Sequence, residues 1–452
     1  MKHLRGRPEC LRLRQLHRRG TGVILAALAV LLCGACAARR VSPQVATWDG
    51  VVQRTGKLLA PRVAQPQSPA PPGIDLRQPL SADDAAAVAL WNNPRLRADL
   101  ASLGLAEADR LDAALVRNPR LDMLIPVGAK PFELLLQLPT ETFFQRPRRL
   151  AAAQQALDQL AQSLIQNALD VARDARWAHA DLAQAVARVD WAKRSLELRE
   201  RLNALTMARL RAGDISALEA VSAEAEVRAA REQVRRFEHD LSIAEERLRA
   251  ILGLNREPLH IRVEPATAQP PGDRSKLLEK AMAFRPDLRA AELAVGAAVQ
   301  RARWERSRVL WLAAQLSSKE VGSLGLLSGP GFNVELPLFH RNQGLIARAE
   351  AEVELASRGY LAAKQRVMLE VAEAREQLLQ AQDSLKRLQQ ELLPTLERAV
   401  SLAQAQYQRG EAPFLLILEQ TRALMDAELR IIDTEAAVRK AEAQLERSVG
   451  SK

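Results

Sequence analysis

The sequence predicts a mainly α-helical protein with long antiparallel coiled-coil helices, four short strands and an internal two-fold repeat. The first observation is residues 148–212, a run without Gly or Pro whose apolar residues follow a 4-3 spacing. The second is a composition with only 4% aromatic residues, so that small aliphatic side chains must form the core. The third is a set of landmarks that occurs twice in the same order. Together these features are typical of long packed helices.

The repeat is clearest around two prolines. Residues 89–98 read ALWNNPRLRA and residues 281–290 read AMAFRPDLRA, which gives an offset of 286 − 94 = 192 residues. The glycine turn at Gly213 recurs at Gly410, with an offset of 197. This period is far longer than a solenoid repeat of about 20–50 residues, so we interpret it as one supersecondary module duplicated. The predicted copies cover residues 81–254 and 272–449.

Residues 1–35 are predicted to be a signal peptide and are left out of the fold. Seven basic residues and Glu9 are followed by an apolar run, 23–33, shorter than the ~20 residues of a transmembrane helix. Small residues then precede Cys36, as in a bacterial lipobox, so we expect Cys36 to be lipidated. Plain signal cleavage is the alternative. Residues 36–80 are expected to be a lipidated N-terminal segment and a proline-rich tether without helical periodicity.

The signal segment changes how the charge and the cysteines are interpreted. It holds a net charge of 7 − 1 = +6, so the formal charge of +11 falls to about +5 in the mature chain. No dense basic stripe remains, and we expect no nucleic-acid partner. Cys36 is the one cysteine left after cleavage, so no intramolecular disulfide is expected.

Helix signals continue along the first copy. Ser81 is expected to cap a helix that runs to about Val116 and is broken near Pro94. The run 148–212 predicts a helix of roughly 90 Å. Its seam is apolar at twelve positions: 157, 161, 164, 168, 171, 175, 178, 182, 185, 189, 192 and 196. Further apolar residues beside the seam favour a helix packed on two sides, as in a ring of helices. A simple antiparallel coiled coil, with a narrower stripe, is the alternative.

The long helix is expected to stop at Gly213, and the next helix to run from a cap at Asp214 or Ser216 to about residue 251. The second copy repeats this scheme. It predicts a helix from about residue 275, a long helix from about 345 to 408 with a bend near Pro394, a turn at Gly410, and a last helix to about 449.

Strands are predicted between the helices. Residues 132–138 and 332–336 alternate apolar and polar side chains, as strands do when one face meets lipid and the other water. Residues 120–125 and 309–316 are the expected partner strands. The predicted water-facing, lumenal residues are Glu133, Gln137, Asn333 and Glu335. Two soluble hairpins packed on helices are the alternative. Four strands are fewer than the eight of the smallest single-chain barrels, and open edges do not occur in lipid, so other copies of the chain are expected to complete a barrel.

The phrase at residues 329–344, GPGFNVELPLFHRNQG, combined with the repeat, resembles the TolC family of outer-membrane efflux proteins, in particular its lipoprotein branch. The resemblance covers about residues 80–449. It implies a homotrimer with a coiled-coil α-barrel and a small membrane β-barrel shared between protomers, four strands from each chain. It also implies the exit duct of a tripartite efflux system, with a periplasmic adaptor protein, an inner-membrane efflux pump and outer-membrane lipid as partners.

The resemblance implies functional residues at the two glycine turns. Acidic gate residues are expected six after the first glycine, and six and nine after the second. This sequence has Glu219, Leu416 and Glu419 at those positions, and Tyr407 three before the second glycine. Leu416 departs from the pattern. We hypothesise that Glu419 narrows the pore and favours cations, whereas an ordinary solvated helix residue is the alternative. The implied adaptor contacts are Gly213, Ser216, Gly410 and Pro413.

Enzymatic chemistry is not expected. The histidines are scattered, no metal-ligand spacing is present, and no glycine-rich phosphate loop follows a strand. We therefore predict no catalytic residues, no metal and no cofactor. Two other functions remain open at this stage, a periplasmic adaptor and a non-conducting structural lipoprotein with a reduced barrel. An adaptor has one hairpin flanked by β-rich domains, whereas this sequence predicts two hairpins and few strands.

Overall fold

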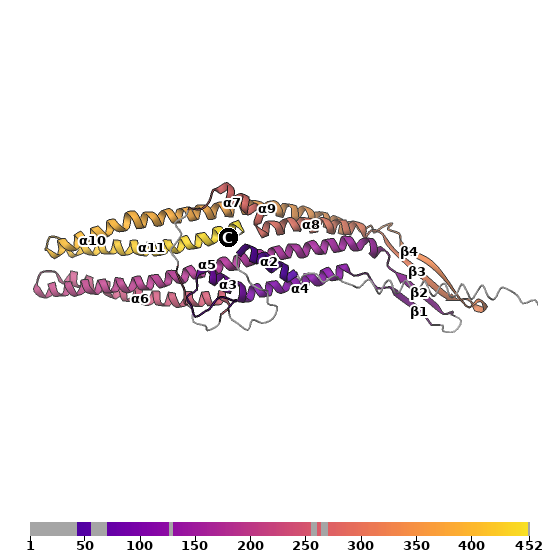
Figure 1. Cartoon of the computed structure of the whole chain (residues 1–452), viewed down its shortest axis with the longest axis horizontal. Helices are drawn as coiled ribbons and strands as arrows, with labels where there is room; N and C mark the ends of the chain where they lie inside the picture. Colours follow the sequence, from indigo (N-terminus) through magenta and orange to yellow (C-terminus); the bar gives the residue numbers. More distant parts are fainter. Residues whose placement is uncertain (1–42, 56–69, 126–129, 255–259, 264–269, 451–452) are drawn as a thin grey trace, which may run out of the picture. The chain divides into compact units, whose positions relative to one another are not determined.

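The computed structural model describes residues 43–55, 70–125, 130–254, 260–263 and 270–450, which belong to the second of two compact units, 43–452. The expected signal peptide, Cys36 and most of the proline-rich tether lie outside the described residues. Within this unit the architecture is mainly helical, with one four-stranded sheet, as the sequence predicts (Figure 1).

The first copy opens with two short helices, α3 (Ala82–Asn92) and α4 (Pro94–Ala114). Ser81 caps α3 through a capping box, in which its hydroxyl accepts from the amide of Asp84 at 3.1 Å and the Asp84 carboxylate accepts from the amide of Ser81 at 3.4 Å. Pro94 occupies the first turn of α4, where no amide donor is needed. The predicted break is therefore a junction between two helices.

The long helix α5 (Glu141–Ala212) has 72 residues. Nine of the twelve predicted seam positions are buried and the other three are half-buried, so the 4-3 pattern identified the packed face correctly. The helix begins seven residues before the predicted start, because Pro147 removes one amide donor without breaking the helix. It ends at Gly213 in the left-handed conformation, φ 83°, and Ser216 caps α6 (Ala217–Leu252).

The second copy contains α7 (Arg274–Phe284), α8 (Pro286–Ser307), α9 (Gln343–Arg387), α10 (Leu393–Gln408) and α11 (Phe414–Val449). A π-helical turn, Leu388–Leu392, separates α9 from α10. Pro394 follows it directly, and a proline inside a helix leaves the carbonyl four residues earlier without its amide partner. The wider π turn is a local adjustment of this kind, at the place where the sequence predicts a bend.

Helix α2 (Pro43–Thr55) was not expected, and the prediction of an irregular segment up to residue 80 is wrong for these residues. The helix packs on α5, with Val51 buried in the same core cluster as Ile165. A Cβ on Gly50 would lie 2.6 Å from Cδ1 of Ile165, so the missing side chain is what allows the close approach. The prediction rested on the lack of helical periodicity in this part of the sequence.

Four antiparallel strands form one sheet in the order β1-β2-β3-β4 (Figure 1). They are β1 (Arg120–Leu124), β2 (Glu133–Leu138), β3 (Trp311–Glu320) and β4 (Leu326–Glu335). Strands β3 and β4 extend further than predicted, toward a tight connection that includes the 3-10 turn Gly322–Leu324. The sequence hides this extension because serines, glycines and a proline interrupt the alternation there.

The two copies share equivalent contacts around their prolines. Nδ2 of Asn93, just before Pro94, donates to the carbonyl of Ile251 at 3.0 Å. Nη1 of Arg285, just before Pro286, donates to the carbonyl of Ser448 at 3.2 Å. These partners correspond under the repeat, since 285 − 93 = 192 and 448 − 251 = 197. In both copies, the residue before the proline holds the end of the returning helix.

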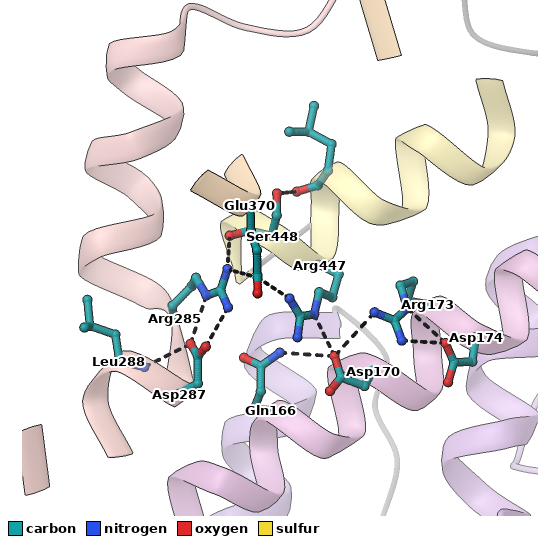
Figure 2. A network of polar contacts seen from close by, with 11 residues as sticks. Gln166, Asp170, Arg173, Asp174, Arg285, Asp287, Leu288, Glu370, Arg447 and Ser448 are labelled. Atoms are coloured by element: carbon teal, nitrogen blue, oxygen red, sulfur yellow. Dashed lines mark hydrogen bonds and ion pairs between the residues drawn. The ribbon is translucent and has the colours of Figure 1, made fainter. Parts of the chain in front are cut away.

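Arg285 is the centre of a polar network that joins the second copy to the first (Figure 2). Its side chain is 0% exposed and forms a bidentate pair with Asp287, at 2.9 and 2.6 Å, and a bond to Glu370 at 2.7 Å. Glu370 also pairs with Arg447 of α11. Arg447 then donates to Asp170 of α5 at 2.6 Å. The network thus ties α8, α9 and α11 to α5.

Replacing Arg285 by Met should lower the free energy of unfolding by about 3–5 kcal/mol, because the change leaves the carboxylates of Asp287 and Glu370 partly buried and without this guanidinium. The purified protein can be unfolded in urea and followed by circular dichroism. The matched control is Arg201→Met, whose partner Glu197 is one turn away on the solvent side of α5 and whose loss should cost under about 0.5 kcal/mol. Equal effects of the two changes would show that the network is not specially stabilising.

The same network predicts a pH dependence. Burial alone would raise the pKa of Asp287, but the bidentate bond to Arg285 outweighs burial and the pKa is lowered. A carboxyl with a lowered pKa stabilises the fold above about pH 4, the value of an unfolded Asp, and this contribution is lost as pH falls through the folded pKa. The stability difference between the natural protein and Asp287→Asn should therefore shrink between pH 5 and pH 3. A constant difference over that range in urea titrations would contradict this assignment.

Candidate functional site

The two glycine turns lie beside each other at the end of the long helices away from the strands (Figure 1). Gly213 and Gly410 both adopt left-handed backbone conformations, with φ of 83° and 77°. Nη2 of Arg209, near the end of α5, donates to the carbonyl of Tyr407 at 3.0 Å. The same guanidinium lies 4.0 Å from the centre of the Tyr407 ring. One arginine therefore connects the two turns.

An apolar cluster, which we call the tip cluster, packs behind the turns. Its buried members are Ala223, Ala403, Tyr407, Phe414, Ile417 and Leu418. The Tyr407 and Phe414 rings are 6.0 Å apart in a tilted arrangement. Leu416 is half-buried against this cluster, which explains why an apolar residue suits a position where the resemblance implied an acid. The Tyr407 hydroxyl is buried and has no hydrogen-bond partner within the described chain.

The two acidic residues singled out by the sequence occupy different environments. Glu219 is half-buried in the first turn of α6, where its amide donates to Oγ of Ser216 at 3.3 Å. A carboxylate is favourable at that helix end. Glu419 is exposed on α11. Within the described residues neither of these two carboxylates forms a salt bridge.

Glu226 is a site residue that the sequence reasoning missed. Its carboxylate accepts a hydrogen bond from Arg422 of α11 and lies 3.5 Å from Nε of Arg199 of α5. The hydrogen bond to Glu226 is the main reason that the pKa of Arg422 is raised, and the nearby Glu419 adds to it. The sequence signal that could have identified this pair is that the two residues lie at similar separations from the two glycine turns. Glu226 is 226 − 213 = 13 residues beyond the first glycine, and Arg422 is 422 − 410 = 12 beyond the second.

The two faces of the sheet differ in polarity, and the face with more charged and amide side chains, the polar face, also carries Leu124, Leu135, Trp311 and Leu327. The strand register places all four predicted lumenal residues, Glu133, Gln137, Asn333 and Glu335, on the same face. Two ion pairs lie on that face, Glu133 with Lys319 at 2.6 Å and Arg120 with Asp122 at 2.9 Å. The opposite face, the apolar face, carries Leu121, Met123, Leu134, Leu136, Leu138, Leu312, Leu316, Phe332 and Val334, with Ser318, Glu320 and Ser328 toward the connection between β3 and β4.

The apolar face is not covered by the helices of the same chain. Phe332, on this face in the edge strand β4, is 74% exposed. Phe143 and Phe144 at the start of α5, and Phe339 just after β4, are also exposed, so aromatic residues gather where the strands meet the helices. Such a distribution is typical of a membrane interface.

Two other kinds of site are absent from the part of the chain that the structure describes. No helix there is both long and apolar enough to cross a membrane. No group of three or more His, Cys, Asp or Glu side chains there is arranged to hold a metal ion.

Comparison with known proteins points in one direction. A family model described as "Outer membrane efflux protein" matches residues 277–451. The cobalt-zinc-cadmium resistance protein CzcC of Cupriavidus metallidurans is 25% identical over 384 residues, which cover 82% of this chain and 90% of that protein. The pyoverdine export outer membrane protein OpmQ of Pseudomonas aeruginosa is 30% identical over 271 residues, 57% of this chain and 55% of that protein.

Solved structures share the fold. The structure of CusC matches with a TM-score of 0.71 and 20% identity, over 87% of this chain and 100% of that one. The outer membrane protein VceC of Vibrio cholerae matches with a TM-score of 0.69 and 18% identity, over 82% of this chain and 96% of that one. In both cases the likeness covers more than four fifths of this chain, and at these identities it concerns the fold.

Replacing Glu226 by Gln should loosen the tip, because Arg199 and Arg422 would then face each other without the carboxylate between them. We expect a loss of about 1.5–3 kcal/mol, seen as faster hydrogen exchange in residues 414–430. Glu224→Gln is the control, since Glu224 pairs only within α6, with Arg228 on the exposed side. If both variants exchange like the natural protein, Glu226 does not hold the two hairpins together.

Proposed function

We propose that the chain is a member of the TolC family of outer membrane efflux proteins, which the family model and the relatives indicate, and that it is the exit channel of a tripartite efflux system. The sheet is the observation that carries the proposal. Its apolar face is open, its polar face gathers charged and amide side chains, and its two outer strands have free edges. In lipid such edges must be paired, so one chain is an incomplete part of a larger object.

A trimer supplies the missing pairing. Three copies with four strands each give 3 × 4 = 12 strands, above the minimum of eight for a barrel. The polar face, with Glu133, Gln137, Asn333 and Glu335, would line the lumen. The apolar face would meet outer-membrane lipid. The long helices would continue the duct into the periplasm as an α-barrel, in which α5 packs on several sides, as its buried residues support.

The partners follow from the tip and from the family. Gly213, Ser216, Gly410 and Pro413 are all exposed at the turns. Leu218 and Leu415, in the first turns of α6 and α11, add exposed apolar surface beside them. This combination suits docking of a helical hairpin from a periplasmic adaptor, which would connect the channel to an inner-membrane pump. Lipid on Cys36 would anchor the N-terminal segment to the outer membrane.

Cargo selection is assigned to the pump rather than to this chain. The two curated relatives are named for different cargos, cobalt, zinc and cadmium in one and pyoverdine in the other. In the channel itself, the described residues contain no cluster of metal ligands. A passive duct with a polar lumen agrees with both relatives.

The gate is proposed at the tip, with Glu419 in the leading role. Its carboxylate is exposed, and three copies would face one another around the axis. Glu219, Leu416 and Tyr407 would support this gate through their packing at the turns. Arg422, one turn further along α11, is bound to Glu226 and so is held in place beside Glu419.

The channel and its gate can be tested together in planar bilayers. We expect ion conductance with a preference for cations, and Glu419→Ala should reduce that preference. Three carboxylates on the order of 10 Å from the axis contribute about 1 kcal/mol together in water, or about fivefold in cation occupancy. The control is Glu246→Ala, an exposed carboxylate far along α6 from the tip.

The outcomes separate the two claims. Absence of conductance from purified, heat-modifiable trimers would overturn the exit-channel function and favour a structural lipoprotein. Conductance with unchanged cation preference in Glu419→Ala would leave the channel in place and remove Glu419 from the gate.

A further inference from the structure

We infer that β4 of one chain pairs with β1 of a second copy in one defined register, in which Glu335 stands opposite Arg120 of the neighbouring copy. The inference rests on the proposed trimer and specifies how its barrel is joined. It is derived from the hydrogen-bond directions along the sheet, the position of one proline, and the charges on the polar face.

Two backbone hydrogen bonds show which neighbouring strand the amide and carbonyl groups of each residue in the sheet face. In an antiparallel sheet, successive residues point their backbone groups alternately to one neighbouring strand and to the other. The amide of Glu320 donates to the carbonyl of Phe132 in β2's direction, and the amide of Val321 donates to Gly325 on the β4 side. With the strand registers, the backbone groups of Leu121 and Met123 in β1 therefore point to the free edge.

The backbone groups of β4 alternate between its two sides in the same way. Gly331, Asn333 and Glu335 point their backbone groups to β3, because their partners in β3 are odd-numbered residues like Val321. Phe332 and Val334 point to the free edge. The backbone of Pro330 also faces the free edge. Because proline has no amide hydrogen, it could not donate a hydrogen bond to a neighbouring strand there. An edge position of this kind is where a strand proline is tolerated.

Hydrogen bonds between β1 of one copy and β4 of another can form only between residues whose backbone groups face the free edges. Near the end of the sheet closest to the helices, three registers meet this condition. In the first, Leu121 pairs with Val334 and Met123 with Phe332. In the second, slipped by two residues, Met123 pairs with Pro330 and loses a hydrogen bond. In the third, slipped the other way, Met123 pairs with Val334.

Charge decides among the registers. In the third register, Asp122 stands directly opposite Glu335, and like charges in that position are destabilising. In the first, Arg120 faces Glu335 and Asp122 faces Asn333, so opposite charges and hydrogen-bonding groups meet on the polar face. On the apolar face, the Met123 thioether meets the ring of Phe332, a favourable contact. The first register alone avoids both the proline and the repulsion.

Strand length agrees with this choice. In the first register the five residues of β1 cover positions 335 to 331 of β4, and the paired segment ends just before Pro330. The ion pair also completes the polar face. Glu133 pairs with Lys319 and Arg120 with Asp122 within one chain. Glu335 belongs to none of these pairs, and it would gain its cation from the neighbouring copy.

Cysteine crosslinking tests the register directly. Asp122 and Asn333 form a non-hydrogen-bonded pair in the first register, with Cα atoms about 4.5 Å apart, within the range of a disulfide. The double variant Asp122→Cys/Asn333→Cys should therefore give covalent trimers on non-reducing gels after mild oxidation in membranes. Asp122→Cys/Gly331→Cys and Asp122→Cys/Glu335→Cys report the second and third registers. Asp122→Cys alone controls for the native cysteines.

Charge exchange provides a second measurement, in an Asp122→Asn background that removes the partner of Arg120 in its own strand. Arg120→Glu or Glu335→Arg should lower the population of heat-resistant trimers by about fivefold per joint. Combining the two changes should restore it. If Arg120 and Glu335 of neighbouring copies were far apart, the double change would not restore the population of heat-resistant trimers.

The results distinguish this inference from the proposed function. Crosslinking in the second or third register, or conducting trimers that crosslink in none and show no charge restoration, would overturn the register while the channel stands. Loss of trimers and of conductance in the natural protein itself would overturn the proposed function.

Discussion

The buried guanidinium of Arg285 is the interaction on which the arrangement of the helices depends. A fully buried charge is costly unless each of its donors is used, and here the donors reach Asp287, Glu370 and the backbone of Ser448. Through Glu370 and Arg447 the same set of charges reaches α5 of the other repeat. The two halves of the chain are thereby fixed to each other near the middle of the long helices, and the turns and the strands are positioned from there.

Much of this architecture could be predicted from the spacing of apolar residues along the helices and from the glycines that end them. The seam of α5 was found because burial along one helix repeats every 3.5 residues, and Gly213 and Gly410 stop helices through a local backbone preference. The members of the polar network and the pair of Glu226 with Arg422 could not be found in this way. Their partners are separated by up to about 280 residues of sequence, and a charged residue on a helix surface has the same local pattern whether it pairs or is solvated.

The two repeats use one plan with different side chains. Asn93 caps α4 and bonds to the end of α6, whereas Arg285 recruits a whole set of carboxylates at the equivalent place. Helix α5 is continuous, whereas its counterpart is divided by the π turn before Pro394. At the tip, Ser216 caps α6 through its hydroxyl, whereas Pro413 only fixes the backbone before α11. The second turn therefore lacks the side-chain cap that the first one has.

The order β1-β2-β3-β4 has a consequence for how the proposed barrel would be built. One chain has two unpaired edges, and an open chain of two copies still has two, so adding a subunit does not reduce the number of exposed edges. Only the closing step removes them, and it removes both at once. Assembly is therefore all-or-none, and incomplete rings keep the sticky edges that lead strands to aggregate. If the ring is the proposed trimer, the three subunits would have to meet before other strands pair with those edges.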